Sequence, residues 1–145
     1  MKRLVIVADL GRIRVFRQVK DRRGHRAWNL VEVPVPQPVG GGRSVYDEVT
    51  DQAGRFPRGG GAGMGHGEAH EMEAEQERKQ VLALGEEIEA LIEAEDCNSW
   101  NLALPSALRA RVMDILSMGV LERLTRVVDA DLTKWPLEKL RERFA

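Results

Sequence analysis

A glycine-rich stretch between residues 51 and 66 constrains this 145-residue chain more than any other feature. Nine of the 14 glycines fall between Gly40 and Gly65, and few large apolar side chains stand among them. Such a stretch cannot form a core of its own, and glycine allows backbone conformations and close approaches that other residues exclude. We therefore predict a single domain, residues 1–145, in which an α/β scaffold carries a flexible working loop at about residues 37–66. A surface insertion without a role is the alternative.

Three segments ahead of the glycine-rich stretch have the patterns of β-strands. Residues 4–8 form a short continuous apolar run, which is typical of a strand buried on both faces. Residues 12–19 alternate between apolar and polar side chains, and residues 28–35 place valines on one side until prolines end the run. Short turn signals separate the three segments, so the pattern predicts an antiparallel meander.

The segment from about residue 67 to residue 95 has helical spacing, in two unlike parts. Its second part should pack on the sheet through Val81, Leu84, Ile88, Leu91 and Ile92. Its first part, residues 68–79, has Met72 as its only large apolar side chain and should project into solvent or towards a partner. The five glutamates in this part suit the positive end of the helix dipole but would repel a phosphate, which argues against a nucleotide-binding loop.

The last third of the chain predicts two more strands and two more helices. Residues 99–104 read as a strand, Pro105 and Ser106 begin a helix that runs to about Leu116, and Gly119 is a natural helix stop. Residues 121–128 read as a fifth strand, before a final helix that ends near Phe144. The order βββ-α-β-α-β-α is that of a ribonuclease-H-like mixed sheet. In that arrangement the first strand lies between the second and the fourth, and runs parallel to the fourth.

Composition and cysteine content predict the solubility and the cellular compartment of the protein. A hydrophobic content of 43% with 31% charged residues is typical of a soluble globular domain. Cys97 is the only cysteine, so a disulfide framework is excluded and a reducing compartment is favoured. The apolar run at residues 4–8 is too short for a signal sequence, and no run reaches membrane-spanning length. We expect a cytoplasmic protein with no membrane partner and no cofactor, whose oligomeric state the sequence leaves open.

The two halves of the chain carry opposite charge. Residues 1–66 hold 12 Lys/Arg against 6 Asp/Glu, and residues 67–145 hold 10 against 17. A basic half favours contact with RNA or phosphate. Several of its arginines, Arg12 and Arg14 among them, fall in and around the predicted hairpin, where a plain solvated face is the alternative.

Catalytic chemistry has two candidate residues, Asp9 and His66. Asp9 follows the first strand, where a ribonuclease-H-like nuclease places a magnesium-binding carboxylate. However, the fourth strand ends in Leu104 and Pro105, without the carboxylate that would complete such a site. His66 and His70 have metal-ligand spacing, but no third His or Cys is near, so we predict no metal site.

The assembled pattern resembles the bacterial host-attachment protein family, proteins described as required for attachment to host cells. The matching residues span nearly the whole chain, and their order carries more weight than any one motif. They are Val7, Ala8, Asp9, Arg12, Arg14 and Phe16; Asp51, Gly54, Arg55 and Phe56; the glycine tract with His66; Leu104, Pro105, Leu108 and Arg109; and Asp131, Leu132, Thr133, Pro136 and Leu140.

That family in turn resembles the middle domain of archaeo-eukaryotic peptide release factors. There a glycine-rich loop ahead of a long helix carries a Gly-Gly-Gln motif, whereas this chain has Arg58, Gly59, Gly60 and Gly61 and lacks the glutamine. The resemblance implies a non-enzymatic module that binds RNA, a ribosome or a translation-related partner through this loop and the basic hairpin. The predicted contact residues are Arg12, Arg14, Arg55, Phe56, Arg58, Gly59, Gly60, Gly61 and His66. A hydrolase of peptidyl-tRNA or a phosphodiester, and a protein-binding module that uses the acidic helix start, are the alternatives.

Overall fold

The computed structural model describes residues 2–20, 28–35 and 66–144. The sequence-predicted loop at about 37–66 therefore lies outside the described residues, except for His66, which begins a helix. The elements, in chain order, are β1 (Arg3–Ala8), β2 (Ile13–Lys20), β3 (Trp28–Val33), α2 (His66–Glu95), β4 (Ser99–Leu104), α3 (Ser106–Met113), α4 (Met118–Arg123), β5 (Leu124–Asp129) and α5 (Leu137–Arg143).

The five strands form one mixed sheet in the order β3-β2-β1-β4-β5. β1 pairs antiparallel with β2 and parallel with β4, so Ile6 lies between Val15 and Leu102. β5 continues the sheet parallel to β4. The predicted central position of the first strand is confirmed, and its continuous apolar sequence explains why. Every residue from Leu4 to Ala8 is buried, as a strand covered on both faces requires.

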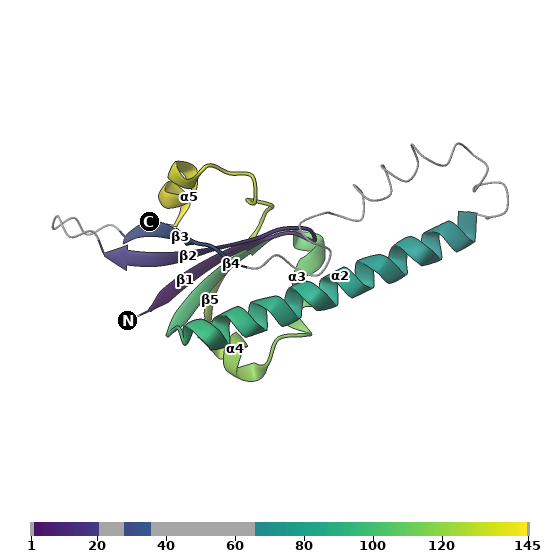
Figure 1. Ribbon diagram of the computed structural model, residues 1–145, viewed down its shortest axis with the longest axis horizontal. Helices are drawn as coiled ribbons and strands as arrows, with labels where there is room; N and C mark the ends of the chain where they lie inside the picture. Colours follow the sequence, from purple (N-terminus) through teal and green to yellow (C-terminus); the bar gives the residue numbers. More distant parts are fainter. Residues whose placement is uncertain (1, 21–27, 36–65, 145) are drawn as a thin grey trace.

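Helices cover the two faces of the sheet unequally (Figure 1). α2, α3 and α4 lie on one face, where Leu4, Ile6 and Trp100 belong to the larger hydrophobic cluster. α5 lies on the other face, where Val5 and Val7 pack in a smaller cluster with Leu140 and Phe144 among its members. Among the described residues, α5 is the one helix on this second face, and it covers only part of the sheet.

The second part of α2 packs closely on the rest of the helical layer. The predicted inner residues Val81, Leu84, Ile88 and Ile92 are all buried. Gly85 lies between them, and an added Cβ there would stand 2.6 Å from Cγ2 of Ile115. The absence of a side chain at Gly85 therefore lets α2 approach the segment that follows α3.

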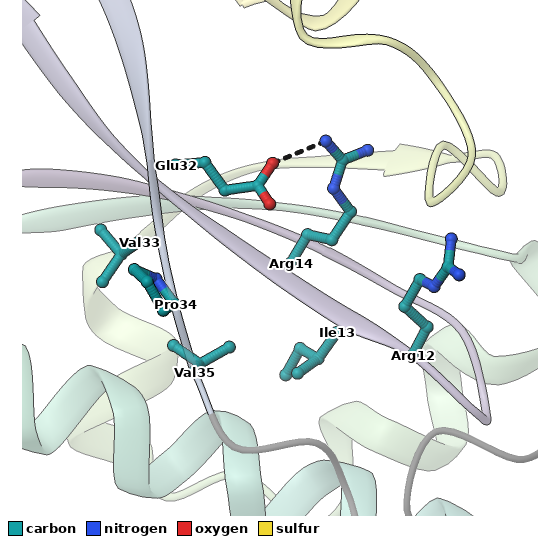
Figure 2. A pocket seen from close by; sticks show the side chains of 7 residues that line it. All are labelled: Arg12, Ile13, Arg14, Glu32, Val33, Pro34 and Val35. Carbon is teal, nitrogen blue, oxygen red and sulfur yellow. Dashed lines mark hydrogen bonds and ion pairs between the residues drawn. The ribbon is translucent and has the colours of Figure 1, made fainter.

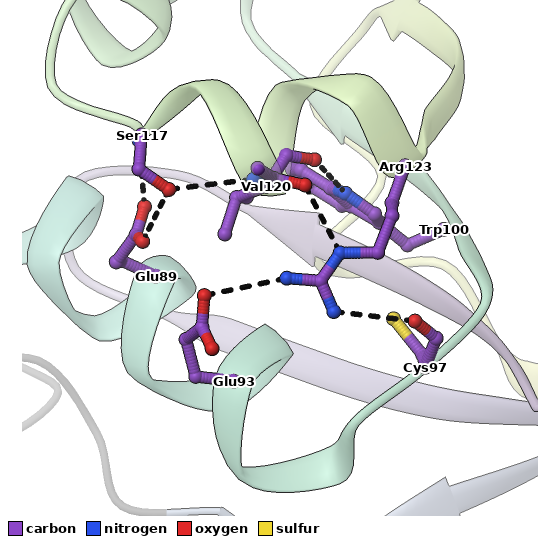
Figure 3. A network of polar contacts seen from close by, with 8 residues as sticks. Glu89, Glu93, Cys97, Trp100, Ser117, Val120 and Arg123 are labelled. Atoms are coloured by element: carbon purple, nitrogen blue, oxygen red, sulfur yellow. Dashed lines mark hydrogen bonds and ion pairs between the residues drawn. The ribbon is translucent and has the colours of Figure 1, made fainter.

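The sequence prediction is wrong between residues 114 and 123. α3 ends at Met113 instead of about Leu116, and a further helix, α4, occupies Met118–Arg123, where Gly119 was expected to stop a helix and Leu121 to begin a strand. The physical reason is a helix cap that α2 supports. The Ser117 hydroxyl accepts a hydrogen bond from the Val120 backbone nitrogen, and both Ser117 N and Oγ donate to Glu89 of α2, at 2.8 and 2.6 Å (Figure 3).

The first part of α2 extends past the sheet, as the sequence predicts (Figure 1). Residues 69–79 are exposed throughout, and Met72 retains 54% of its accessible surface. Nothing in the two hydrophobic clusters comes from this stretch.

Candidate functional site

Asp9 shapes the turn between β1 and β2. Its Oδ1 atom accepts hydrogen bonds from the backbone nitrogens of Gly11, at 2.9 Å, and Arg12, at 2.8 Å. The Asp9 backbone nitrogen donates in turn to the Arg12 carbonyl, at 2.9 Å. One carboxylate oxygen is thus occupied by the turn itself, which is a common use of aspartate at such positions.

The buried side chain of Thr133 links Asp9 to the segment before α5. The Thr133 Oγ1 atom lies 2.6 Å from Asp131 Oδ1 and 3.2 Å from Asp9 Oδ2. A hydroxyl has one proton, so it donates to the nearer carboxylate, that of Asp131. Within residues 2–20, 28–35 and 66–144, no group of three or more His, Cys, Asp or Glu side chains could hold a metal ion.

Arg14 is held by its own chain. Its NH1 donates to the carbonyls of Thr133, at 3.1 Å, and Trp135, at 2.7 Å, and its NH2 donates to Glu32, at 2.6 Å (Figure 2). The side chain is only 18% exposed. This arginine therefore ties β2 to β3 and to the segment before α5.

Arg12 has a different environment from Arg14. It is exposed at the end of the hairpin turn, and its guanidinium makes no drawn contact with the other residues of Figure 2. Both arginines line an open cavity of about 390 Å³, together with residues at the end of β3. Of the two predicted hairpin arginines, Arg12 is the one whose charge faces solvent.

A second cavity, of about 430 Å³, lies on the sheet face that α5 covers only in part. It is lined by Arg3, Gln18, Trp28, Ser99, Asn101, Thr125, Arg126 and Phe144. Strand alternation explains the location, because Arg3 precedes the buried Val5 by two residues and shares its side of the sheet. We call this the Arg3 cavity.

Arg3 lies over the ring of Trp28 in the Arg3 cavity. The guanidinium carbon of Arg3 lies 4.3 Å from the centroid of the Trp28 ring, and Lys20 Nζ lies 5.6 Å from it. The Nε atom of Arg3 is buried and, among the described residues, has no hydrogen-bond partner. Two arginines and, among the described residues, no acidic side chain line the cavity, which favours a positive potential there.

Some of the polar side chains around Arg3 and Arg126 already form hydrogen bonds within the chain. Gln18 Nε2 donates to the Phe144 carbonyl at 2.9 Å, which closes the cavity towards α5. The Thr125 hydroxyl contacts the Asn101 side-chain oxygen, and Asn101 lies opposite Arg126 in the register of β4 and β5. The cavity therefore combines two cations, from β1 and β5, with amide and hydroxyl groups from β2, β4 and β5.

The structure brings together some of the sequence-predicted site residues. Asp9, Arg12 and Arg14 share the end of the sheet where β1 turns into β2. Arg55, Phe56, Arg58, Gly59, Gly60 and Gly61 lie outside the described residues, and only the backbone of His66 is described. The sequence interpretation missed the Arg3 cavity, although extending the alternation of β1 back from Val5 would have placed Arg3 on the partly open face.

Cys97 is buried, and burial raises the pKa of its thiol, an effect that the nearby Arg123 cation only partly opposes. Arg123 NH1 donates to the Cys97 carbonyl at 3.3 Å and NH2 to Glu93 at 3.3 Å (Figure 3). A reactive cysteine needs a lowered pKa and access to solvent. The environment of Cys97 favours a packing role.

Among the described residues, no helix combines the length and the apolar character that crossing a bilayer requires.

The chain was compared with known proteins at the levels of family, sequence and structure. No curated protein and no solved structure gives a significant match. One family model matches residues 4–144, that is, nearly the whole chain from β1 to the end of α5. The matched region includes the Asp9 turn, the Arg14 contacts and the Arg3 cavity, apart from Arg3 itself. This chain therefore belongs to the family described as "protein required for attachment to host cells".

Proposed function

We propose that this host-attachment family member is a non-enzymatic module that binds RNA, in the context of the ribosome or another translation-related partner. The observation that carries the proposal is the separation of charge between the hairpin strands and α2. The described residues up to Val35 contain six basic and two acidic side chains: Lys2, Arg3, Arg12, Arg14, Arg17 and Lys20 against Asp9 and Glu32. α2 contains two basic and ten acidic side chains.

This separation gives RNA one favourable direction of approach. A phosphate backbone is attracted to the β1–β3 side and repelled by α2, whose acidic first part extends away from the sheet. Arg12 is exposed on the attractive side, and the sequence prediction adds Arg55, Phe56 and Arg58 of the glycine-rich stretch as contact residues. The translation context rests on the sequence resemblance to release factors alone.

We also propose that the sheet is a variant of the ribonuclease-H-like fold. An antiparallel β1-β2-β3 meander continued by two parallel strands supports this assignment. The additional helix α4 would be a local elaboration between α3 and β5.

The test is binding of a fluorescein-labelled 12-nucleotide oligouridylate to the full chain at low and moderate salt. We expect weak binding in which log K falls with log salt by about 0.7 per phosphate contact. The Arg12→Ala/Arg55→Ala/Arg58→Ala variant should bind less and show a shallower slope, with an unchanged melting temperature. Arg109→Ala removes an exposed arginine of α3, one that pairs with Asp129, and serves as the control. A wild type that does not bind at low salt excludes the proposal.

The first alternative is a hydrolase in which Asp9 and His66 would be the catalytic residues. The contacts of Asp9 with the turn and with Thr133 favour a structural role for this carboxylate. Incubation of the protein with peptidyl-tRNA and with a single-stranded RNA should leave both intact. Cleavage that is lost in Asp9→Asn would establish the hydrolase instead.

A protein partner at the start of α2 is the other alternative, favoured by the full exposure of residues 69–79. Affinity purification with and without ribonuclease distinguishes it from RNA binding. A protein that stays bound after ribonuclease, and is lost from Glu73→Lys/Glu77→Lys, would be held by this helix rather than by RNA.

A further inference from the structure

We propose that the Arg3 cavity is a phosphate-binding site that takes one phosphate of a single-stranded RNA backbone. The inference rests on the proposed RNA-binding function and names a site for it made of residues other than those that the sequence predicts to bind. Three independent features of the cavity lead to it: a positioned guanidinium, an unsatisfied donor, and the sign of the surrounding charge.

The first feature is the position of Arg3. Its guanidinium lies over the ring of Trp28, with 4.3 Å between the guanidinium carbon and the ring centroid. Stacking on an indole holds the guanidinium plane in one orientation, so less side-chain freedom is lost when an anion binds. β1 is the central strand of the sheet, so its backbone is fixed between two neighbours.

The second feature is the Nε–H group of Arg3. The Nε atom is buried, and no acceptor among the described residues receives its hydrogen bond. Buried donors in folded proteins are nearly always paired, so an unpaired one needs an explanation. A bound anion provides an acceptor, and the Nε–H and a terminal N–H of one guanidinium can hold two oxygens of a phosphate together.

The third feature is the charge of the lining. Arg126 contributes a second guanidinium from β5, and none of the eight lining residues is acidic. Neither arginine forms an ion pair within the part of the chain that the structure describes. Two cations that lack an ion-pair partner among the described residues favour a multiply oxygenated anion over a neutral ligand.

The size and openness of the cavity identify the phosphate as part of a larger molecule. Its volume of about 430 Å³ exceeds the needs of one phosphate group and accommodates a nucleotide unit. Because Arg3 covers a face of Trp28, the tryptophan positions the arginine instead of stacking on a base. An RNA strand that passes over β3 would also meet Lys20, which lies beside the same ring.

Three probes distinguish the sources of the phosphate: inorganic phosphate, uridine 5′-monophosphate, and the 12-nucleotide oligouridylate. Binding is followed by the NMR signals of the Trp28 indole N–H and of the arginine Nε–H groups in the full chain. We expect the oligouridylate to shift the Arg3 and Trp28 signals, and Arg3→Gln to weaken its binding by roughly tenfold or more, since hydrogen bonds to charged groups are lost. Arg109→Gln, which removes an exposed arginine outside the cavity, should change binding less than twofold, within the small range expected of a surface charge.

Arg3→Lys keeps the charge but removes the Nε donor, and it should weaken binding nearly as much as Arg3→Gln. Thermal melts of each variant establish that it folds. If the Arg3 variants unfold, Arg126→Gln tests the same site, because Arg126 is an exposed residue of β5. RNA binding that neither Arg3→Gln nor Arg126→Gln weakens overturns this inference and leaves the proposed function intact. Arg3 and Trp28 signals that respond to inorganic phosphate or the mononucleotide but not to RNA overturn the RNA ligand of this inference and keep the phosphate site. No response of these signals to any probe overturns the whole inference, whereas the proposed function falls only if the oligouridylate does not bind the wild type at low salt.

Discussion

Arg17 in β2 and Glu95 at the end of α2 form a two-point ion pair across 78 residues of sequence. Arg17 Nε lies 3.2 Å from Glu95 Oε2, and Arg17 NH2 lies 3.0 Å from Glu95 Oε1. The hydrogen bond from Arg17 lowers the pKa of the Glu95 carboxyl. Lys2 Nζ, which donates to the Glu95 carbonyl at 3.1 Å, adds a second contact at this corner of the molecule.

The first prediction concerns the pH dependence of this pair. Because the folded state lowers the pKa of Glu95, protonation favours the unfolded state. The stabilisation by the Arg17–Glu95 pair is therefore fully present above the pKa of an unfolded glutamate, about 4.3. It is lost as the pH falls through the pKa of Glu95 in the folded state. Glu95→Gln should be less stable than wild type at pH 7 in urea titrations, and the difference should shrink as the pH is lowered below the unfolded value. Glu86→Gln changes an exposed carboxylate of the same helix, and a similar pH effect there would contradict the prediction.

The second prediction concerns the packing of Gly85 against Ile115. Gly85→Ala would place a Cβ 2.6 Å from Cγ2 and 2.9 Å from Cβ of Ile115. Overpacking costs about 1–3 kcal/mol, and the better helix propensity of alanine offsets up to about 1 kcal/mol, so urea unfolding should show a net loss. Gly119→Ala in α4 meets nothing within 4 Å and should be stabilising by about 0.5–1 kcal/mol. Equal effects of the two substitutions would rule out the steric account.

The third prediction concerns the hydroxyl of Thr133, a residue that is 1% exposed. Thr133→Val keeps the shape of the side chain but removes its hydrogen bond to Asp131 and its contact with Asp9. We expect a loss of about 1–3 kcal/mol in the free energy of unfolding, since a hydrogen bond from a buried hydroxyl to a carboxylate is removed. Thr133→Ser keeps the hydroxyl and should lose less free energy of unfolding than Thr133→Val. If the serine variant is the less stable of the two, packing of the threonine methyl group matters more than the hydroxyl.

The fourth prediction concerns the reactivity of Cys97. Burial raises the pKa of its thiol and blocks access, so iodoacetamide should alkylate the native protein far more slowly than the urea-unfolded chain. Alkylation rates measured across a urea series should follow the unfolded fraction. Rapid alkylation in the absence of urea would mean that this corner of the sheet opens locally.

The sequence predicted the parts of the fold whose burial is complete. Residues 4–8 form an apolar run that is buried on both faces, residues 99–104 contribute the buried Trp100, Leu102, Ala103 and Leu104, and the structure places the two segments side by side as β1 and β4. The inner stripe of α2 was equally clear, because four of its five predicted residues are fully buried. Such patterns depend on a single chain segment and its solvent exposure.

Features that depend on two distant segments could not be predicted in this way. The N-terminus of α4 is supported by Glu89, which lies 28 residues before Ser117 and accepts hydrogen bonds from its backbone N–H and its hydroxyl. The residues around Gly119 give no sign of this distant contact. The Arg3 cavity requires the register that sets Asn101 opposite Arg126 and the stacking of Arg3 on Trp28. The predicted contacts of Arg55, Phe56 and Arg58 lie beyond the described residues and stay predictions.

The central position of β1 has a consequence for synthesis on the ribosome. Its antiparallel neighbour follows within a few residues, but its parallel neighbour begins at Ser99, after the whole of α2 has been made. At about 5–20 residues per second, the interval from the end of β3 to the start of β4 lasts roughly 3–13 s. During that time one edge of the most apolar strand in the chain has no partner. The nascent meander therefore depends on a chaperone, the ribosome surface or its own emerging helix to avoid pairing with another chain.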